Sequence, residues 1–233
     1  MKKIIFIIML CLPLLIQAQV ISLKLDMNDD ILCIPNNTMI KNHMDLSMSG
    51  FGFFYTFNLF ERTSMSTGVN FKSSKVELQL KTIDGYFPLN IHSESDQTIG
   101  IPIHLKTSFD LYKEKLSVFY KYGITTTFFP DSYRGNIYGG KTVKNLRYTQ
   151  YVYYPKKNIN LSLLGGFGIN YKTKYLHYSL SLEYNAGLFE RYTSLTVIHF
   201  SDSDYYELNK ILSKGSYWGV FFEIGYPLSR LEK

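Results

Sequence analysis

Residues 99–112 alternate between apolar and polar side chains almost without error. After a three-residue connection, 113–115, residues 116–129 repeat the pattern. A period of two places the two kinds of side chain on opposite faces of a β-strand. Strands of soluble proteins usually have about five or six residues. The sequence therefore predicts a long β-hairpin, tall enough to cross a membrane at a tilt, which needs roughly 9–11 residues per strand.

Further segments carry the same alternation and raise the predicted number of strands to eight. Two of them change phase once, near Gly50 and near Ser73–Ser74, as a β-bulge does. The first, residues 20–27, is the least regular. The predicted strands are residues 20–27, 45–57, 65–80, 99–112, 116–129, 159–172, 176–188 and 218–228.

Short and long connections alternate between these strands. The short ones are residues 58–64, 113–115 and 173–175, and the long ones are residues 30–43, 81–98, 130–158 and 190–217. Outer-membrane barrels have an even number of strands, short periplasmic turns and long external loops. The pattern holds with both chain ends in the periplasm only if residues 20–27 are a strand. The predicted fold class is all-β, an eight-stranded antiparallel up-and-down transmembrane β-barrel. Residues 204–213 could form one short helix in the last long connection.

The first eighteen residues have the features of a secretory signal peptide. Lys2 and Lys3 precede an apolar stretch at 4–16, and Gln17 and Ala18 follow it. This stretch is short for a membrane helix, although a retained signal anchor is the alternative. We therefore expect a cleaved signal peptide at 1–18 and an outer-membrane barrel domain at 19–233.

Composition adds information about the surroundings of the barrel. Aromatic residues make up 16% of the chain, with 20 Tyr and 17 Phe against one Trp. An apolar ring with a polar tip suits the lipid headgroup level of a membrane barrel. The net charge of +6 is mild, and no nucleic-acid-binding motif accompanies it, so we expect no nucleic-acid partner. No phosphate loop, redox motif or metal-ligand spacing predicts a cofactor.

Three strand motifs resemble the PorT-like family of small outer-membrane β-barrels, which is common in Bacteroidota. They are Ile101-Pro102 through Lys106, the segment GFGINY at 166–171, and the segment YNAGL at 184–188. The resemblance covers about residues 43–228. It implies the fold and an outer-membrane location, and it implies no biochemical activity because the family has none agreed.

The last predicted strand resembles a barrel-assembly signal. Gly219, Phe222 and Ile224 follow the order of glycine, aromatic and apolar positions. Such barrels often end on an aromatic residue, whereas this chain continues through Pro227 to Lys233. We expect the barrel-assembly machinery to be a partner.

The polar faces of the predicted strands carry charged side chains. The interior of an eight-stranded barrel is just wide enough for side chains to fill, and unpaired buried charge is unfavourable. The sequence therefore predicts a structural plug of paired polar groups, with a conducting pore as the alternative. Its principal residues are His104, Lys106, Lys121, Glu183 and Glu223, with Lys24, Asp26, Lys72, Asp110 and His177 on the same faces.

A weak catalytic pattern lies in the last long connection. His199 and Ser201 alternate along a strand end, and Glu207 is a carboxylate that could orient the histidine. This pattern looks a little like that of outer-membrane lipid A deacylases, but Asp202 stands where those enzymes have asparagine. A polar loop is the simpler interpretation. A lipid A-modifying hydrolase is the alternative function.

The connection at 130–158 combines basic and aromatic residues. Basic and aromatic side chains together could bind the phosphates of lipopolysaccharide, or an external glycan or protein. The alternative is a solvated loop with non-specific headgroup contacts. The candidate binding residues are Arg134, Lys141, Lys144, Arg147, Tyr148 and Tyr151.

The sequence thus predicts an integral outer-membrane barrel with a structural or surface-binding role and no catalysis. Outer-membrane lipid and lipopolysaccharide are its expected surroundings. A secreted, lipocalin-like soluble barrel is a further alternative. The direction of the apolar faces distinguishes the two, because a soluble barrel buries them inside and a membrane barrel turns them to lipid.

Overall fold

The computed structural model describes residues 19–33, 40–42, 47–74, 77–82, 85–90, 96–113, 115–129, 138–143, 146–153, 158–190, 192–200 and 206–228. The predicted signal peptide lies outside these residues. Within them, no helix is long and apolar enough to cross a membrane. The strands are β1 (Val20–Cys33), β2 (Ile40–Asn42), β3 (Ser47–Asn58), β4 (Thr63–Ser74), β5 (Glu77–Thr82), β6 (Gly85–Asn90), β7 (Asp96–Tyr112), β8 (Leu116–Phe128), β9 (Tyr138–Val143), β10 (Leu146–Tyr153), β11 (Ile159–Lys172), β12 (His177–Gly187), β13 (Tyr192–Phe200) and β14 (Tyr206–Pro227).

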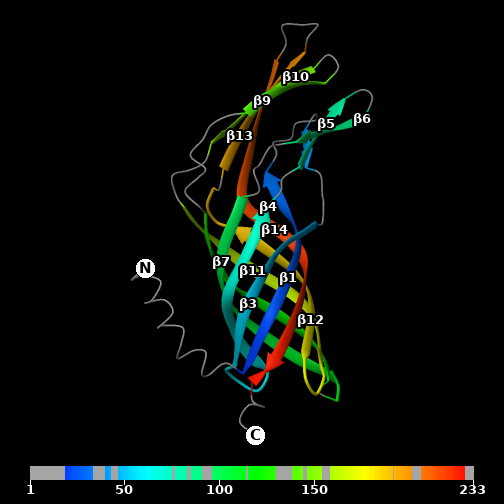
Figure 1. The fold of residues 1–233 in the computed structure, drawn as a ribbon, viewed down its shortest axis with the longest axis vertical. Coiled ribbons are helices and arrows are strands. Elements are labelled where there is room, and N and C mark those ends of the chain that lie inside the picture. The colour runs from blue at the N-terminus through cyan, green and yellow to red at the C-terminus, as the bar shows by residue number, and fades with distance from the viewer. Residues whose placement is uncertain are drawn as a thin grey trace.

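Eight of these strands form a closed antiparallel barrel (Figure 1). The order around the ring is β1-β3-β4-β7-β8-β11-β12-β14, and β14 pairs with β1 to close it. Each barrel strand overlaps one of the eight segments that alternate in the sequence. The predicted eight-stranded antiparallel up-and-down barrel is confirmed. Closure gives every long strand two neighbours and leaves no exposed edge in the ring.

Strand β1, which had the weakest sequence signal, closes the ring. It pairs with β14 from Val20 opposite Pro227 to Cys33 opposite Leu212, and with β3 on its other side. The amide of Leu228 donates a hydrogen bond to the carbonyl of Gln19 at 2.8 Å. The strand ends near Gln19 and Leu228 therefore meet at the same end of the barrel as the three short turns, as the alternation of connections predicts.

Strands β7 and β8 form the long hairpin that the sequence predicts. Its register runs from Ile99 opposite Phe128 to Tyr112 opposite Leu116. Lys113 adopts a left-handed conformation with φ of 41°, and the amide of Lys115 donates to the carbonyl of Tyr112 at 2.9 Å. The connection thus makes a tight turn between two long strands.

The two predicted phase changes have different structural causes. Gly50 pairs with Asp26, whereas Met48 pairs with Met27, so Ser49 is an extra residue in a β-bulge as predicted. The prediction of a single strand at 65–80 is wrong. Strand β4 ends at Ser74, and β5 belongs to a separate three-stranded sheet in the order β2-β5-β6.

Strand β14 continues beyond the barrel wall into an extension of the same sheet. Its first half, from Tyr206 to Ser213, pairs with β13, which pairs with β10, which pairs with β9 (Figure 1). These four segments form the outer sheet. The predicted helix at 204–213 is therefore wrong over the described residues from Tyr206 onward. The spacing of its apolar residues suits a helix, but the unpaired edge of β13 supplies a hydrogen-bond ladder that outweighs this local preference.

Two glycines of β11 provide a matched test of the packing inside and outside the wall. A Cβ added to Gly168 would overlap the carbonyl oxygen of Leu180 and the ring of Phe119, whereas a Cβ on Gly165 would meet no atom within 4 Å. We expect Gly168→Ala to lower the free energy of unfolding by about 1–3 kcal/mol and Gly165→Ala to change it by less than about 0.5 kcal/mol. Urea unfolding in lipid vesicles measures both, and equal effects would contradict this packing.

Candidate functional site

The inner wall of the barrel is predominantly polar. The inward positions of the barrel strands bury many hydroxyl, amide and charged side chains and only a few apolar ones. The buried charged and imidazole side chains of the wall include Lys24, Asp26, Lys72, His104, Lys121 and Glu183. Glu223 and Lys106 are half-buried, and Asp110 is exposed at the rim. The structure thus places the five principal residues of the predicted plug, His104, Lys106, Lys121, Glu183 and Glu223, inside the barrel.

Glu183 on β12 lies at the centre of the buried charges. Its carboxylate accepts a hydrogen bond from Lys24 of β1 at 2.8 Å and forms a second ion pair with Lys121 of β8. It also accepts from the hydroxyl of Ser181 at 2.7 Å. One carboxylate therefore joins three strands of the ring, which is the pairing that a buried charge requires.

Three phenylalanine side chains complete the filling of the interior. Phe54 of β3, Phe119 of β8 and Phe221 of β14 are between 1% and 3% exposed. The ammonium of Lys24 lies 4.0 Å from the ring centroid of Phe221 and 5.5 Å from that of Phe54. Rings and ammonium groups at these distances attract each other. Sequence alternation alone does not assign these residues to the interior, although each is an aromatic residue at an otherwise polar position of its strand.

The end of the barrel away from the short turns has a second polar group. The ammonium of Lys72 lies 3.5 Å from the ring centroid of Tyr217, and the Tyr217 hydroxyl accepts a hydrogen bond from Asn185 at 2.7 Å. The cavity here is only about 20 Å³. The buried charges in the middle of the barrel and this narrow cavity are compatible with the predicted plug, which stays a prediction.

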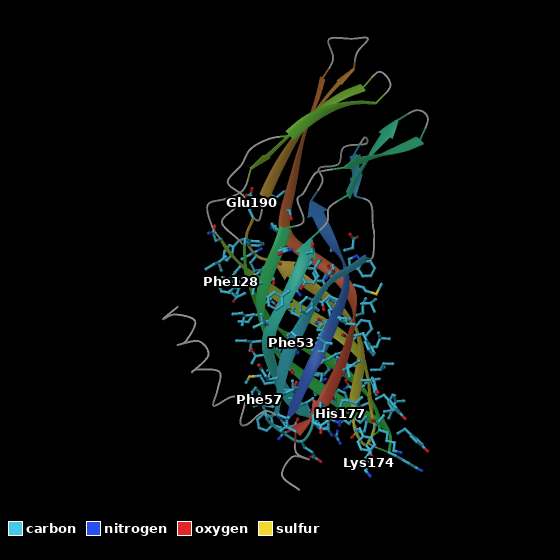
Figure 2. All side chains as sticks on the ribbon, viewed as in Figure 1. Phe53, Phe57, Phe128, Lys174, His177 and Glu190 are labelled. Atoms are coloured by element: carbon cyan, nitrogen blue, oxygen red, sulfur yellow. The ribbon has the colours of Figure 1, made fainter. Side chains whose placement is uncertain are left out.

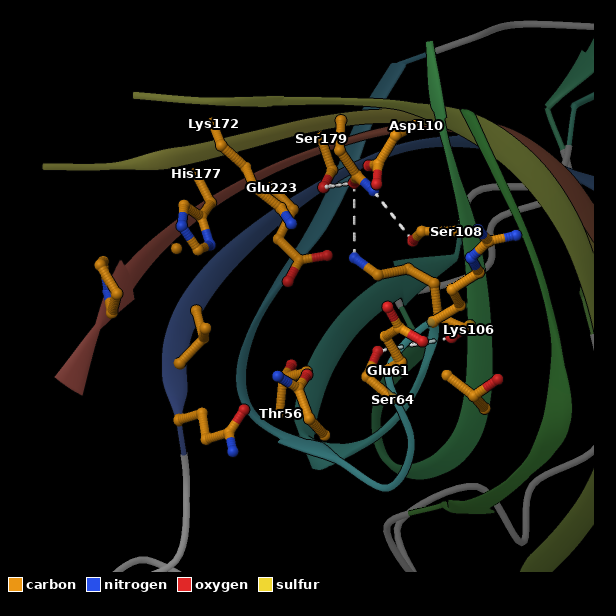
Figure 3. Close-up of a pocket in the computed structure, with 18 residues that line it drawn as sticks. Thr56, Glu61, Ser64, Lys106, Ser108, Asp110, Lys172, His177, Ser179 and Glu223 are labelled. Carbon is orange, nitrogen blue, oxygen red and sulfur yellow. Dashed lines mark hydrogen bonds between the residues drawn. The ribbon is translucent and has the colours of Figure 1, made fainter. Parts of the chain in front are cut away.

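The short-turn end is open instead. A cavity of about 260 Å³ lies between Lys106 and Glu223 (Figure 3). Lys106 donates to the side-chain oxygen of Asn170 at 3.4 Å, and Glu223 accepts from the hydroxyl of Ser22 at 2.5 Å. His177 lines the same cavity. This cavity, unlike the one beside Lys72 and Tyr217, has room for a small ligand.

The outer wall has the opposite chemistry. Figure 2 shows side chains standing out from the wall between Phe128 and the turn that carries Lys174. The exposed outward positions of the described barrel strands between these ends are apolar, aromatic or Gly, and none of them is charged. Exposed residues of this belt include Leu23, Phe53, Val69, Ile103, Tyr122, Ile124, Leu163, Phe167, Leu180, Leu182 and Phe222. A soluble barrel has its apolar side chains inside, so this arrangement is the reverse of the lipocalin-like alternative.

Tyrosines gather at the lower border of the belt. Tyr112, Tyr171, Tyr175 and Tyr226 are 44% to 62% exposed near the short-turn end. From Ile99 to Leu111, a strand rise of about 3.4 Å per residue and a tilt of about 40° give a height of roughly 30 Å. The hydrocarbon core of a bilayer is about 30 Å thick, so the belt matches a membrane in height as well as in composition.

The predicted catalytic residues are placed only in part. His199 in β13 pairs with Tyr206 of β14, and Glu207 pairs with Ile198, one step away in the register. Ser201 lies outside the described residues. The triad therefore stays a prediction. Within the described part of the chain, no group of three or more His, Cys, Asp or Glu side chains could hold a metal ion.

Four of the predicted surface-binding residues lie in the outer sheet. Lys141 belongs to β9, and Arg147, Tyr148 and Tyr151 belong to β10. In the register, Tyr148 pairs with Lys141, and Arg147 pairs with His199 of β13. The other two residues of the set, Arg134 and Lys144, lie outside the described part of the chain.

The fold and its two surfaces define a closed antiparallel β-barrel with an apolar exterior and a polar, filled interior. No protein-family model matches this chain, and no curated protein matches it in sequence. The chain is similar in structure to the outer membrane protein OprG from Pseudomonas aeruginosa, with 10% identity and a TM-score of 0.48 over 90% of this chain and 96% of that one. It is also similar to the outer membrane protein AlkL, with 9% identity and a TM-score of 0.42 over 91% of this chain and 92% of that one.

The buried carboxylate provides the test of the plug. Glu183→Gln would leave two ammonium groups in the interior without their counter-charge, so we expect it to destabilise the barrel by about 3–5 kcal/mol. Urea unfolding of protein refolded into vesicles measures the change. Glu61→Gln, which neutralises an exposed carboxylate at the β3–β4 turn, is the control. Equal stability of the two variants would show that the ion pairs contribute nothing.

Proposed function

We propose that the protein is an integral outer-membrane β-barrel with a structural and surface-binding role and no catalysis. The observation that carries this proposal is the belt of exposed apolar and aromatic side chains around a closed barrel whose interior buries charged side chains. Lipid is the solvent that stabilises such an exterior, since an exposed apolar surface of this extent is unfavourable in water. The predicted signal peptide at 1–18 supplies the export that this location requires.

The short-turn end is assigned to the periplasm. Short turns on that side and long connections on the other are the usual organisation of outer-membrane barrels. In this orientation the sheet of β9, β10, β13 and the first half of β14 extends from the outer side of the membrane (Figure 1). The filled interior supports a role as an anchor for this sheet rather than as a pore.

The membrane location can be tested at Leu182, an exposed residue at the middle of β12. We expect Leu182→Arg to destabilise the barrel by about 2–4 kcal/mol in vesicles, because an arginine would face the bilayer midplane. In a soluble barrel the same exposed position would change stability by less than about 0.5 kcal/mol. The measurement is urea unfolding, in which the shift of the folded band on a gel reports the fraction of folded protein.

Leu182→Phe is the control, because it changes the shape of the side chain and keeps it apolar. The same samples also test location, since wild-type protein should be recovered from the outer-membrane fraction of cells. Recovery in the soluble fraction, together with a stable Leu182→Arg variant, would refute the proposal.

Lipopolysaccharide phosphate is the proposed ligand of the outer sheet. The support comes from the basic and aromatic residues that β9 and β10 bring into neighbouring register positions, with Tyr148 opposite Lys141 and Arg147 in the next position along β10. Guanidinium and ammonium groups bind phosphate through charge-assisted hydrogen bonds. An external glycan or protein with acidic groups would use the same residues.

Neutralising the basic set tests this binding. We expect the combined variant Arg134→Gln, Lys141→Gln, Lys144→Gln and Arg147→Gln to raise the Kd for immobilised lipopolysaccharide by at least about tenfold, since one charged hydrogen bond contributes about 1.5–3 kcal/mol. The matched control removes four exposed lysines at the opposite end of the barrel: Lys113, Lys115, Lys172 and Lys174. Equal losses in the two variants would mean that binding depends on net charge and not on the outer sheet.

Membership of the PorT-like family is proposed on the sequence motifs. The structure gives each motif a barrel strand, with residues 101–106 in β7, 166–171 in β11 and 184–188 running through β12 to just past its end. Recognition by the barrel-assembly machinery is proposed for the last strand, where Gly219, Phe222 and Ile224 lie in the half of β14 that closes the ring.

A further inference from the structure

The cavity at the short-turn end has the dimensions of a small-ligand site. Its volume of about 260 Å³ lies just below the roughly 300–1,000 Å³ of pockets for drug-sized molecules. The ring of Phe119, which is 3% exposed, lies beside it, 4.9 Å from the ammonium of Lys106. The cavity lies at the short-turn end, which is assigned to the periplasm, and Phe119 separates it from the buried charges at the centre of the barrel.

Two opposite charges face each other across this cavity (Figure 3). Lys106 is on β7 and Glu223 is on β14, and these strands are four places apart in a ring of eight. They are therefore diametrically opposed. Among the described side chains, no salt bridge joins the two groups.

Each of these charges has only neutral hydrogen-bond partners. The ammonium of Lys106 donates to the side-chain oxygen of Asn170 at 3.4 Å, which is a long contact for an ammonium group. The carboxylate of Glu223 accepts a hydrogen bond from the hydroxyl of Ser22. Asn170 is fixed in turn by the hydroxyls of Ser179 at 2.5 Å and Ser117 at 3.3 Å. The cavity thus holds a positive and a negative group in set positions, each with capacity for a further partner.

We propose that this cavity binds a small zwitterion, with its carboxylate at Lys106 and its ammonium group at Glu223. A free amino acid and a short peptide share this chemistry. A simple anion would be attracted by Lys106 and repelled by Glu223. A simple cation would be attracted by Glu223 and repelled by Lys106. A zwitterion satisfies both half-buried charges at once, and it leaves the net charge of the cavity unchanged.

The rim of the cavity has the same balance of charge. Arg62, Lys172 and His177 stand there with Glu61 and Asp110. Neither sign dominates this entrance, so its field does not select for anions or for cations. A ligand with both charges can approach from the periplasmic side without opposition.

Calorimetry on the folded, full-length barrel in detergent tests the proposal. The probes are L-alanine and L-alanyl-L-alanine, which distinguish a free amino acid from a peptide by their relative affinity. N-acetyl-L-alanine lacks the ammonium group, and L-alaninamide lacks the carboxylate. We expect at least one zwitterion to bind about tenfold or more tightly than either blocked analogue. Equal affinity of blocked and zwitterionic probes, or no binding of any probe at millimolar concentration, would overturn the proposal.

Two substitutions assign the charges individually. Glu223→Gln should remove the preference for L-alanine over N-acetyl-L-alanine, because the ammonium group loses its partner. Lys106→Gln should remove the preference over L-alaninamide for the corresponding reason. Lys115→Gln, an exposed cation in the β7–β8 turn outside the cavity, is the control and should keep both preferences. The folded-band shift on a gel confirms that each variant has folded, and a variant that keeps its preference would refute the assigned contact.

Discussion

The carboxylate of Glu183 is the group on which the arrangement of the barrel most depends. It is 1% exposed and lies between ammonium groups from β1 and β8. In a medium of low dielectric constant, an unpaired charge is strongly unfavourable, so the three strands must be staggered in a way that brings these groups together. A shift of one residue in β12 would turn Glu183 to the outside and Leu182 or Tyr184 to the inside. The ion pairs therefore help to specify the register of the ring.

The wall of the barrel separates two environments that impose opposite requirements. Outside, the apolar belt can contact hydrocarbon because the hydrogen bonds of the closed ring satisfy the backbone. Inside, many serine, asparagine and charged side chains hydrogen-bond to one another, and the rings of Phe54, Phe119 and Phe221 pack among them. Both sets come from the same strands through alternation. In each strand, one set of alternating residues therefore suits the apolar surroundings of the barrel, and the other set suits its polar interior.

The architecture was predictable from the sequence where alternation is long and regular. The eight strands of the ring follow from it, and the alternation of short and long connections identified even β1, whose own pattern is weak. The outer sheet was not predictable in the same way. Residues 206–213 have apolar side chains at helical spacing, and only the edge of β13, supplied by the fold, makes them a strand. Local pattern cannot report a partner that is distant in the sequence.

The interior was likewise predictable from the sequence only in part. Alternation assigns Lys121, Glu183 and Glu223 to the polar faces of their strands, but the choice of partners depends on the stagger between strands that are not sequence neighbours. The pairing of Glu183 with Lys24, 159 residues away, is of this kind. Phe221 was visible as the one irregular residue in the alternation of its strand. Its position beneath the ammonium of Lys24 gives that irregularity a structural reason.

The seam between β1 and β14 also determines when the molecule can be completed. The hydrogen bond from Ser22 to Glu223 joins residues 201 positions apart, which makes this a fold of high contact order, and such folds form slowly. One edge of β1 stays unpaired until β14 has joined the ring. Until then Glu223 is absent from the wall and the cavity opposite Lys106 has only one of its two charges. The chain acquires its closed wall and the complete cavity at its short-turn end in the same final step of folding.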